Sequence, residues 1–180
     1  AVKLYEASAQ NAFYDVFAEL CGLTETCYNM WQIAAVEAKF MEVQETAWGM
    51  SEKLMTLPAE DLVAYTSTME ETIAYIKEMD AKYNEYRDIL FRCYDYQDNS
   101  TATDDIVAAF AAVVDKYSQR ATATTVEEFD AAIAELKEAS LAYAFEATPN
   151  DGFEFEGVVY VESAWVGTLP EDSLATYIYN

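Results

Sequence analysis

The chain has 180 residues, of which 53% are hydrophobic, and its 33 acidic and 10 basic residues give a formal net charge of -23. This length suffices for a domain with its own core, and such a hydrophobic content, with 14 tyrosines, excludes intrinsic disorder. The negative charge repels nucleic-acid phosphates, and charges interrupt every apolar run before the roughly 18 residues that a membrane span needs. We therefore expect a soluble, folded protein that binds no nucleic acid and has no transmembrane segment.

Apolar residues at spacings of three and four predict two helices in the first third of the chain. The first is expected from Val2 to Leu20, with Gly22 as its stop, and the second from Thr24, as its N-cap, to about Thr56. The predicted apolar stripes are Leu4, Phe13, Val16, Phe17 and Leu20 in the first helix, and Tyr28, Trp31, Ala35, Val36, Phe40, Val43, Ala47, Met50 and Leu54 in the second.

The strongest periodic signal belongs to a third helix, for which Pro58 suits the first position. Steps of three and four then continue without a slip through Leu62, Tyr65, Met69, Thr72, Ile76, Met79, Tyr83, Tyr86, Leu90 and Cys93. This stripe predicts one helix of about 40 residues that packs in coiled-coil fashion on an antiparallel partner. The alternative is a pair of shorter helices separated near Asp80.

Two shorter helices are expected next, after a polar stretch at residues 95–103. Thr125 and Glu128 form a capping box that opens the fifth helix, and Pro149 requires that helix to end by Thr148. The expected inward-facing residues are Ile106, Val107, Phe110, Val113, Val114 and Tyr117 in the fourth helix, and Phe129, Ile133, Leu136 and Leu141 in the fifth. We therefore predict a mainly α protein, with an antiparallel helical bundle at residues 1–148.

The last part of the chain, residues 149–180, changes to an alternating pattern that is typical of short strands. A β hairpin or pair of strands is marginally stable alone, so this tail is expected to pack on the bundle, a neighbouring domain or another copy. The residues that would make such an assembly contact are Phe153, Phe155, Val158, Tyr160, Trp165, Tyr177 and Tyr179.

The absence of histidine excludes serine–histidine and cysteine–histidine catalysis, as well as histidine-ligated haem, zinc and di-iron sites. No glycine-rich phosphate loop is present either. Carboxylate pairs do occur, but at this acid content they are expected on solvated helix faces. They are Glu42 with Glu45, Glu135 with Glu138, and the group Glu127, Glu128 and Asp130. We therefore expect no enzymatic activity and no cofactor, with calcium as the one ion to consider.

Calcium has two candidate loops, because carboxylate and amide oxygens are its preferred ligands. The first contains Asp95, Asp98, Asp104 and Asp105, and the second contains Asn150, Asp151 and Glu154. Neither has the EF-hand spacing with its central glycine and closing glutamate.

Three cysteines would lie at one end of the predicted bundle. In an exported protein, Cys21 and Cys27 could form a disulfide across the turn, or Cys27 could pair with Cys93 of the antiparallel third helix. The alternative is that all three are small buried residues.

The segment from Thr125 to Leu136, Thr-Val-Glu-Glu-Phe-Asp-Ala-Ala-Ile-Ala-Glu-Leu, resembles the FIVAR-type helical modules of bacterial secreted and cell-surface proteins. The similarity covers about residues 103–146. It implies a spacer or binding module outside the cell, without catalytic residues. Asn99 lies in an N-glycosylation triplet, and Ser173 lies in a triplet similar to the O-glycosylation signal of exported Bacteroidetes proteins.

Together these patterns predict a non-enzymatic structural, adhesive or assembly module of an extracellular or cell-surface protein. Its expected partners are proteins, namely other copies of the chain or neighbouring domains, with self-association through the C-terminal tail. The alternative is an acidic binding protein that recognises a basic partner or a divalent cation.

Overall fold

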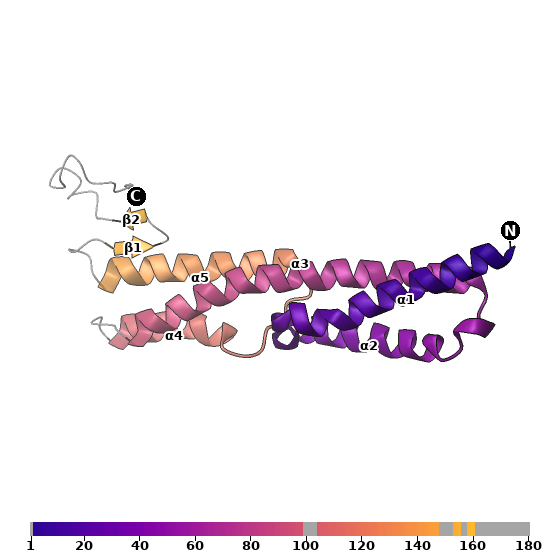
Figure 1. The fold of residues 1–180 in the computed structure, drawn as a ribbon. Helices are drawn as coiled ribbons and strands as arrows, with labels where there is room; N and C mark the ends of the chain where they lie inside the picture. Colours follow the sequence, from indigo (N-terminus) through magenta and orange to yellow (C-terminus); the bar gives the residue numbers. More distant parts are fainter. Residues whose placement is uncertain (1, 99–103, 148–152, 156–157, 161–180) are drawn as a thin grey trace. The chain divides into compact units, whose positions relative to one another are not determined.

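The computed structural model describes residues 2–98, 104–147, 153–155 and 158–160 (Figure 1). These residues are mainly helical, as the sequence predicts. In chain order the elements are α1 (Val2–Thr26), the 3-10 helix η1 (Tyr28–Gln32), α2 (Ala34–Ser51), the 3-10 helix η2 (Leu54–Thr56), α3 (Ala59–Asp98), α4 (Asp104–Tyr117), α5 (Val126–Ala147), β1 (Phe153–Phe155) and β2 (Val158–Tyr160).

The chain divides into two compact units, and the helices α3 and α5 contribute to both. The first unit consists of Ala1–Tyr86 and Arg120–Asp130, and the second of Arg87–Gln119 and Ala131–Asn180. The predicted boundary near residue 148 lies outside the described residues. No described helix is both long and apolar enough to cross a lipid bilayer.

In the first unit, α1, α2 and the beginning of α3 lie alongside one another (Figure 1). Their apolar faces form a core whose largest fully buried residues are Phe13, Leu20, Leu23, Met30, Ile33, Phe40, Leu62, Met69, Ile76 and Met79. Polar contacts join the helices at the edge of this core. The Lys77 Nζ donates to Glu19 Oε1 at 2.7 Å, and the Tyr65 hydroxyl donates to the Val43 carbonyl at 3.1 Å.

Helix α3 spans 40 residues, so the prediction of one long helix is confirmed and the alternative of a break at Asp80 is wrong. All members of its predicted stripe are buried except Tyr65 and Tyr83, which are half-buried. Asp80 instead anchors the neighbouring turn. Its Oδ1 accepts the backbone N–H of Asn29 at 2.9 Å, and the Asn29 side-chain amide donates to Asn84 Oδ1 at 3.1 Å.

The predicted boundary between the first two helices is wrong. Helix α1 continues through Gly22 to Thr26, because Leu23 is buried one turn after Leu20 and offsets the roughly 1 kcal/mol that a helical glycine costs. Thr24 is therefore no N-cap, and its hydroxyl donates to the Cys21 carbonyl within α1.

The chain then leaves the helix at Cys27 and forms η1 before α2 begins at Ala34. This change shifts the helical phase of the residues assigned to the second stripe. Tyr28 is 74% exposed and Trp31 is also exposed, whereas Val36 and Phe40 are buried as predicted.

The segment before α5 is tied to the start of α2 by a short parallel bridge between Ile33 and Ala121. The Ala34 N–H donates to the Ala121 carbonyl at 3.0 Å, and the Ala121 N–H donates to the Gln32 carbonyl at 3.1 Å. An ion pair between Arg120 and Glu37 lies beside this bridge.

The predicted capping box at α5 is present in modified form. The Glu128 N–H donates to the Thr125 hydroxyl at 3.3 Å, while the Glu128 carboxylate accepts the N–H of Thr124. This arrangement satisfies two donors at the start of the helix.

In the second unit, α4 and α5 are joined by aromatic and polar contacts. The rings of Phe110 and Tyr143 are stacked with centroids 4.5 Å apart, and Lys116 Nζ donates to Glu135 Oε2 at 2.6 Å. Cys93 of α3 also packs against α5, because its Sγ lies 3.2 Å from the hydroxyl oxygen of Ser140. The strands β1 and β2 pair antiparallel, with Phe153 opposite Tyr160 and Phe155 opposite Val158.

Candidate recognition surface

Several large side chains of the first unit are exposed, and three of them belong to α1, α2 and η2. Trp48 of α2 is 59% exposed, Tyr14 of α1 is 50% exposed, and Met55 of η2 is 80% exposed. Single exposed apolar residues are normal in proteins, so their significance depends on whether they lie together.

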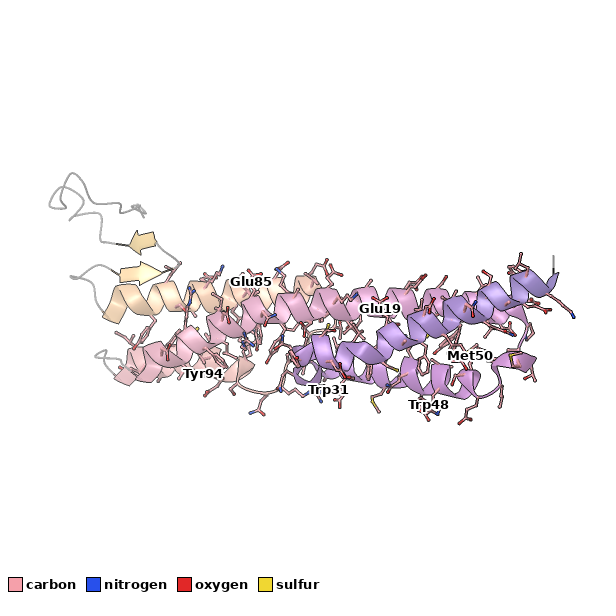
Figure 2. The ribbon with its side chains drawn as sticks, viewed as in Figure 1. Glu19, Trp31, Trp48, Met50, Glu85 and Tyr94 are labelled. Carbon is pink, nitrogen blue, oxygen red and sulfur yellow. The ribbon has the colours of Figure 1, made fainter. Side chains whose placement is uncertain are left out.

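The three residues are related through Phe17 and through one surface pocket. The Trp48 ring meets the Phe17 ring edge-on, with centroids 6.0 Å apart, and Tyr14 precedes Phe17 by one helical turn. Tyr14 and Met55 line the same surface pocket. We call Tyr14, Trp48 and Met55 the Trp48 surface. Figure 2 shows Trp48 towards one end of α2 and Trp31 near the other.

The pocket beside Tyr14 has a volume of about 240 Å³, which is below the roughly 300–1,000 Å³ of pockets for drug-sized ligands. Its walls come from α1, from the last residue of α2 and from the connection between α2 and α3. The lining residues are Gln10, Asn11, Tyr14, Ser51, Glu52, Lys53, Leu54, Met55 and Thr56.

Some polar groups of this pocket form hydrogen bonds within the chain and others do not, among the described residues. The Ser51 hydroxyl donates to the Trp48 carbonyl at 2.6 Å, and the Thr56 hydroxyl donates to the Lys53 carbonyl at 2.8 Å. Both hydroxyls thus keep acceptor capacity. The side-chain amides of Gln10 and Asn11 have no hydrogen-bond partner within the described part of the chain.

The sequence contains a signal for this surface outside the apolar stripes. Tyr14 and Trp48 each follow a predicted core residue, Phe13 and Ala47, and therefore fall one position outside the apolar stripes. A large aromatic residue at such a position is a candidate surface contact. The pocket itself depends on the course of the chain from Ser51 to Thr56, which periodicity does not specify.

Several of the candidate carboxylates take part in contacts that stabilise the fold. A hydrogen bond from the Lys116 ammonium lowers the pKa of Glu135, with a second contribution from the Tyr117 hydroxyl. The backbone N–H of Thr124 lowers the pKa of Glu128. Asp130 accepts from Lys82 at 2.7 Å, and this contact raises the pKa of the lysine.

The calcium candidates are placed only in part. Asp95 and Asp98 belong to the last turns of α3 rather than to a loop, and Asp104 and Asp105 open α4. Asp151 and Asn150 lie outside the described residues, and Glu154 is in β1. Among the described residues, no three cysteine, aspartate or glutamate side chains lie together in a way that could hold a metal ion.

The three cysteines are free thiols in the structure and have different surroundings. Cys21 lies beside the Gln44 amide, with 3.7 Å between Sγ and Nε2, and Cys27 faces the turn anchored by Asp80. Cys93 Sγ lies 3.2 Å from Ser140 Oγ. Burial raises the pKa of both Cys27 and Cys93.

The predicted disulfide pairings, Cys21 with Cys27 or Cys27 with Cys93, stay predictions. They assumed a second helix that begins at Thr24 and has Cys27 in its first turn. Because α2 begins only at Ala34, the residues of α3 that meet the turn after α1 are Asp80 and Asn84.

The remaining predicted sites lie mostly beyond the described residues. These are the glycosylation candidates Asn99 and Ser173 and the assembly candidates Trp165, Tyr177 and Tyr179. The other assembly candidates, Phe153, Phe155, Val158 and Tyr160, are in the paired strands β1 and β2.

Comparisons with known proteins give no match among family models, curated proteins or solved structures. The resemblance of residues 103–146 to FIVAR-type modules thus stays a prediction.

Proposed function

We propose that this chain is a non-enzymatic adhesive or assembly module of an exported or cell-surface protein, and that the Trp48 surface contacts its partner. The observation that carries the proposal is the exposure of Tyr14 and Met55 at one pocket, together with the exposure of Trp48, which lies one helical turn before the pocket residue Ser51. Aromatic side chains contribute much of the binding energy in recognition surfaces, because they bury a large area and lose little conformational entropy.

A second, independent contact surface is proposed at the C-terminal tail, through which copies of the chain would self-associate or meet a neighbouring domain. Among the described residues the sheet contains β1 and β2 alone. Two short strands are marginally stable by themselves, and each offers an unpaired edge to a further strand.

An acidic binding protein remains the alternative proposal. With a net charge of -23, the chain would attract a basic partner or a divalent cation over long range, and that attraction would weaken steeply as salt is added. Binding that is insensitive to salt would count against this alternative.

The principal proposal can be tested with the full-length chain immobilised on a biosensor. Three probes represent the partner classes: a mixture of neutral oligosaccharides, a lysine-rich peptide, and the same chain in solution. The variant Tyr14→Ala/Trp48→Ala should lose most of the binding to at least one probe.

The control is Leu4→Ala/Tyr28→Ala, which also removes two exposed side chains but leaves the Trp48 surface intact. It should bind as the wild type does. If the wild type and both double variants bind every probe equally well, the proposed role of the Trp48 surface is wrong.

A further inference from the structure

The pocket beside Tyr14 combines one aromatic ring with several neutral polar groups. Gln10 and Asn11 each offer both donors and acceptors, and Ser51 and Thr56 offer hydroxyl oxygens. Tyr14 is half exposed, so one part of its ring is available to a ligand. A ligand that fits this lining needs many hydroxyl-type groups and an apolar face.

The charges at the pocket argue for a neutral ligand. Glu52 and Lys53 are adjacent and of opposite sign, so the lining has no net charge. The whole chain carries a net charge of -23, which would repel a phosphate or carboxylate group. A cation would meet a single carboxylate with an ammonium group next to it, which is a poor site for either a metal ion or a basic side chain.

The dimensions of the site limit the size of the ligand. About 240 Å³ accommodates one small ring rather than a drug-sized molecule or a helix. Trp48 lies one turn along α2 from Ser51 and is itself exposed, so a second ring of the same ligand could extend over it.

We propose that this pocket binds a neutral saccharide, with the C–H face of one pyranose ring on Tyr14 and the ring hydroxyls on Gln10, Asn11 and Glu52. This inference rests on the proposed recognition function and assigns a ligand class to the same surface. A pyranose ring has the two properties that the lining requires, since one face is rich in C–H groups and the rim is rich in hydroxyls.

The test uses the isotope-labelled full-length chain and NMR titration with methyl glycosides of glucose, galactose, mannose and N-acetylglucosamine. At least one of these should shift the backbone amides of Asn11 and Ser51 in a saturable manner. Glucuronate should bind more weakly, and added salt should recover part of its affinity because salt screens the net charge.

Two substitutions probe the two parts of the site. Tyr14→Ala and Asn11→Ala should each raise the dissociation constant about tenfold or more, equivalent to ~1.4 kcal/mol. Both positions are exposed, so the helical circular dichroism and thermal midpoint should change little. Tyr28→Ala, on the exposed side of η1, is the matched aromatic control and should leave the dissociation constant unchanged.

Saturable shifts at the pocket that weaken in both variants would support the saccharide site. The absence of shifts with all four glycosides, or shifts that are equal in the wild type and Tyr14→Ala, would overturn it. Binding of the lysine-rich peptide or of a second copy that depends on Tyr14 and Trp48, without any saccharide binding, would overturn this inference and leave the proposed recognition function standing.

Discussion

The buried stripe of α3 and the Trp48 surface are both rich in large apolar side chains, yet one builds the core and the other faces solvent. In α3 these residues recur at steps of three and four from Leu62 to Cys93, and nearly all are buried. Tyr14 and Trp48 lie one position outside the stripes of their helices. Residue type alone therefore does not distinguish a buried position from an exposed one, whereas helical phase separates Tyr14 and Trp48 from the buried stripe residues beside them.

The largest loss of stability is expected from a substitution in the buried stripe of α3. Ile76 is fully buried, so Ile76→Ala should lower the free energy of unfolding by about 2–5 kcal/mol through lost burial and a cavity. Denaturant unfolding followed by circular dichroism measures the change.

Val63→Ala is the matched control on the same helix, because Val63 is 44% exposed. It should change the free energy of unfolding by no more than about 0.5 kcal/mol. Equal losses in the two variants would mean that the α3 stripe is not the core of the first unit.

A smaller loss of stability is expected when the contact of α3 with the turn after α1 is removed. Asp80→Ala removes the acceptor for the Asn29 N–H and should cost about 1.5 kcal/mol, typical of a hydrogen bond to a charged group. Asp80→Asn keeps a side-chain oxygen and should cost clearly less in the same unfolding experiment. If the two variants were equally destabilised, the charge of Asp80 rather than its hydrogen bond would be responsible.

Removal of the N-cap of α5 should lower the free energy of unfolding by about the same amount or slightly less. Thr125→Ala removes the hydroxyl that accepts the Glu128 N–H and is expected to cost about 1 kcal/mol, whereas Thr125→Ser keeps the oxygen. Thermal unfolding of both variants measures the difference. A serine variant as unstable as the alanine variant would argue against hydroxyl capping.

The smallest expected effect is a pH dependence of stability that arises from the contact between α4 and α5. Because the pKa of Glu135 is lowered in the folded state, its contribution to stability is present above the ordinary pKa of glutamate and is lost as pH falls through the folded value. The stability difference between the wild type and Glu135→Gln should therefore be largest near neutral pH and should shrink in acid.

Glu138→Gln removes the same charge from the same helix and is the control for this measurement. A wild-type advantage over Glu135→Gln that grows as pH falls would contradict the assigned contact with Lys116.

Periodicity predicted the helices well because burial of an apolar stripe determines where long helices form. It identified α3 as one long helix as far as Cys93, although Asp95 and Asp98 of its last turns were assigned to a loop, and it identified the opening of α5 at Thr125. It failed between Leu20 and Ala34, where Gly22 looks like a stop but burial of Leu23 continues the helix, and where Tyr28 and Trp31 then fall in a 3-10 turn.

The candidate site was less accessible to sequence reasoning. The pocket forms where the connection after α2 passes Gln10, Asn11 and Tyr14, and no local pattern specifies that approach. The start of α2 at Ala34 was not predicted for a related reason, and it places Asp80 and Asn84 of α3 against the turn after α1.

The most direct test of the Trp48 surface is the fluorescence of Trp48 in a full-length chain carrying Trp31→Phe and Trp165→Phe. Its emission should be that of a solvent-exposed indole and should move to shorter wavelength when one of the three probes, the neutral oligosaccharides, the lysine-rich peptide or a tryptophan-free copy of the chain, is added. An emission spectrum that stays unchanged with all three probes at saturating concentration would contradict the claim that this surface is a recognition surface.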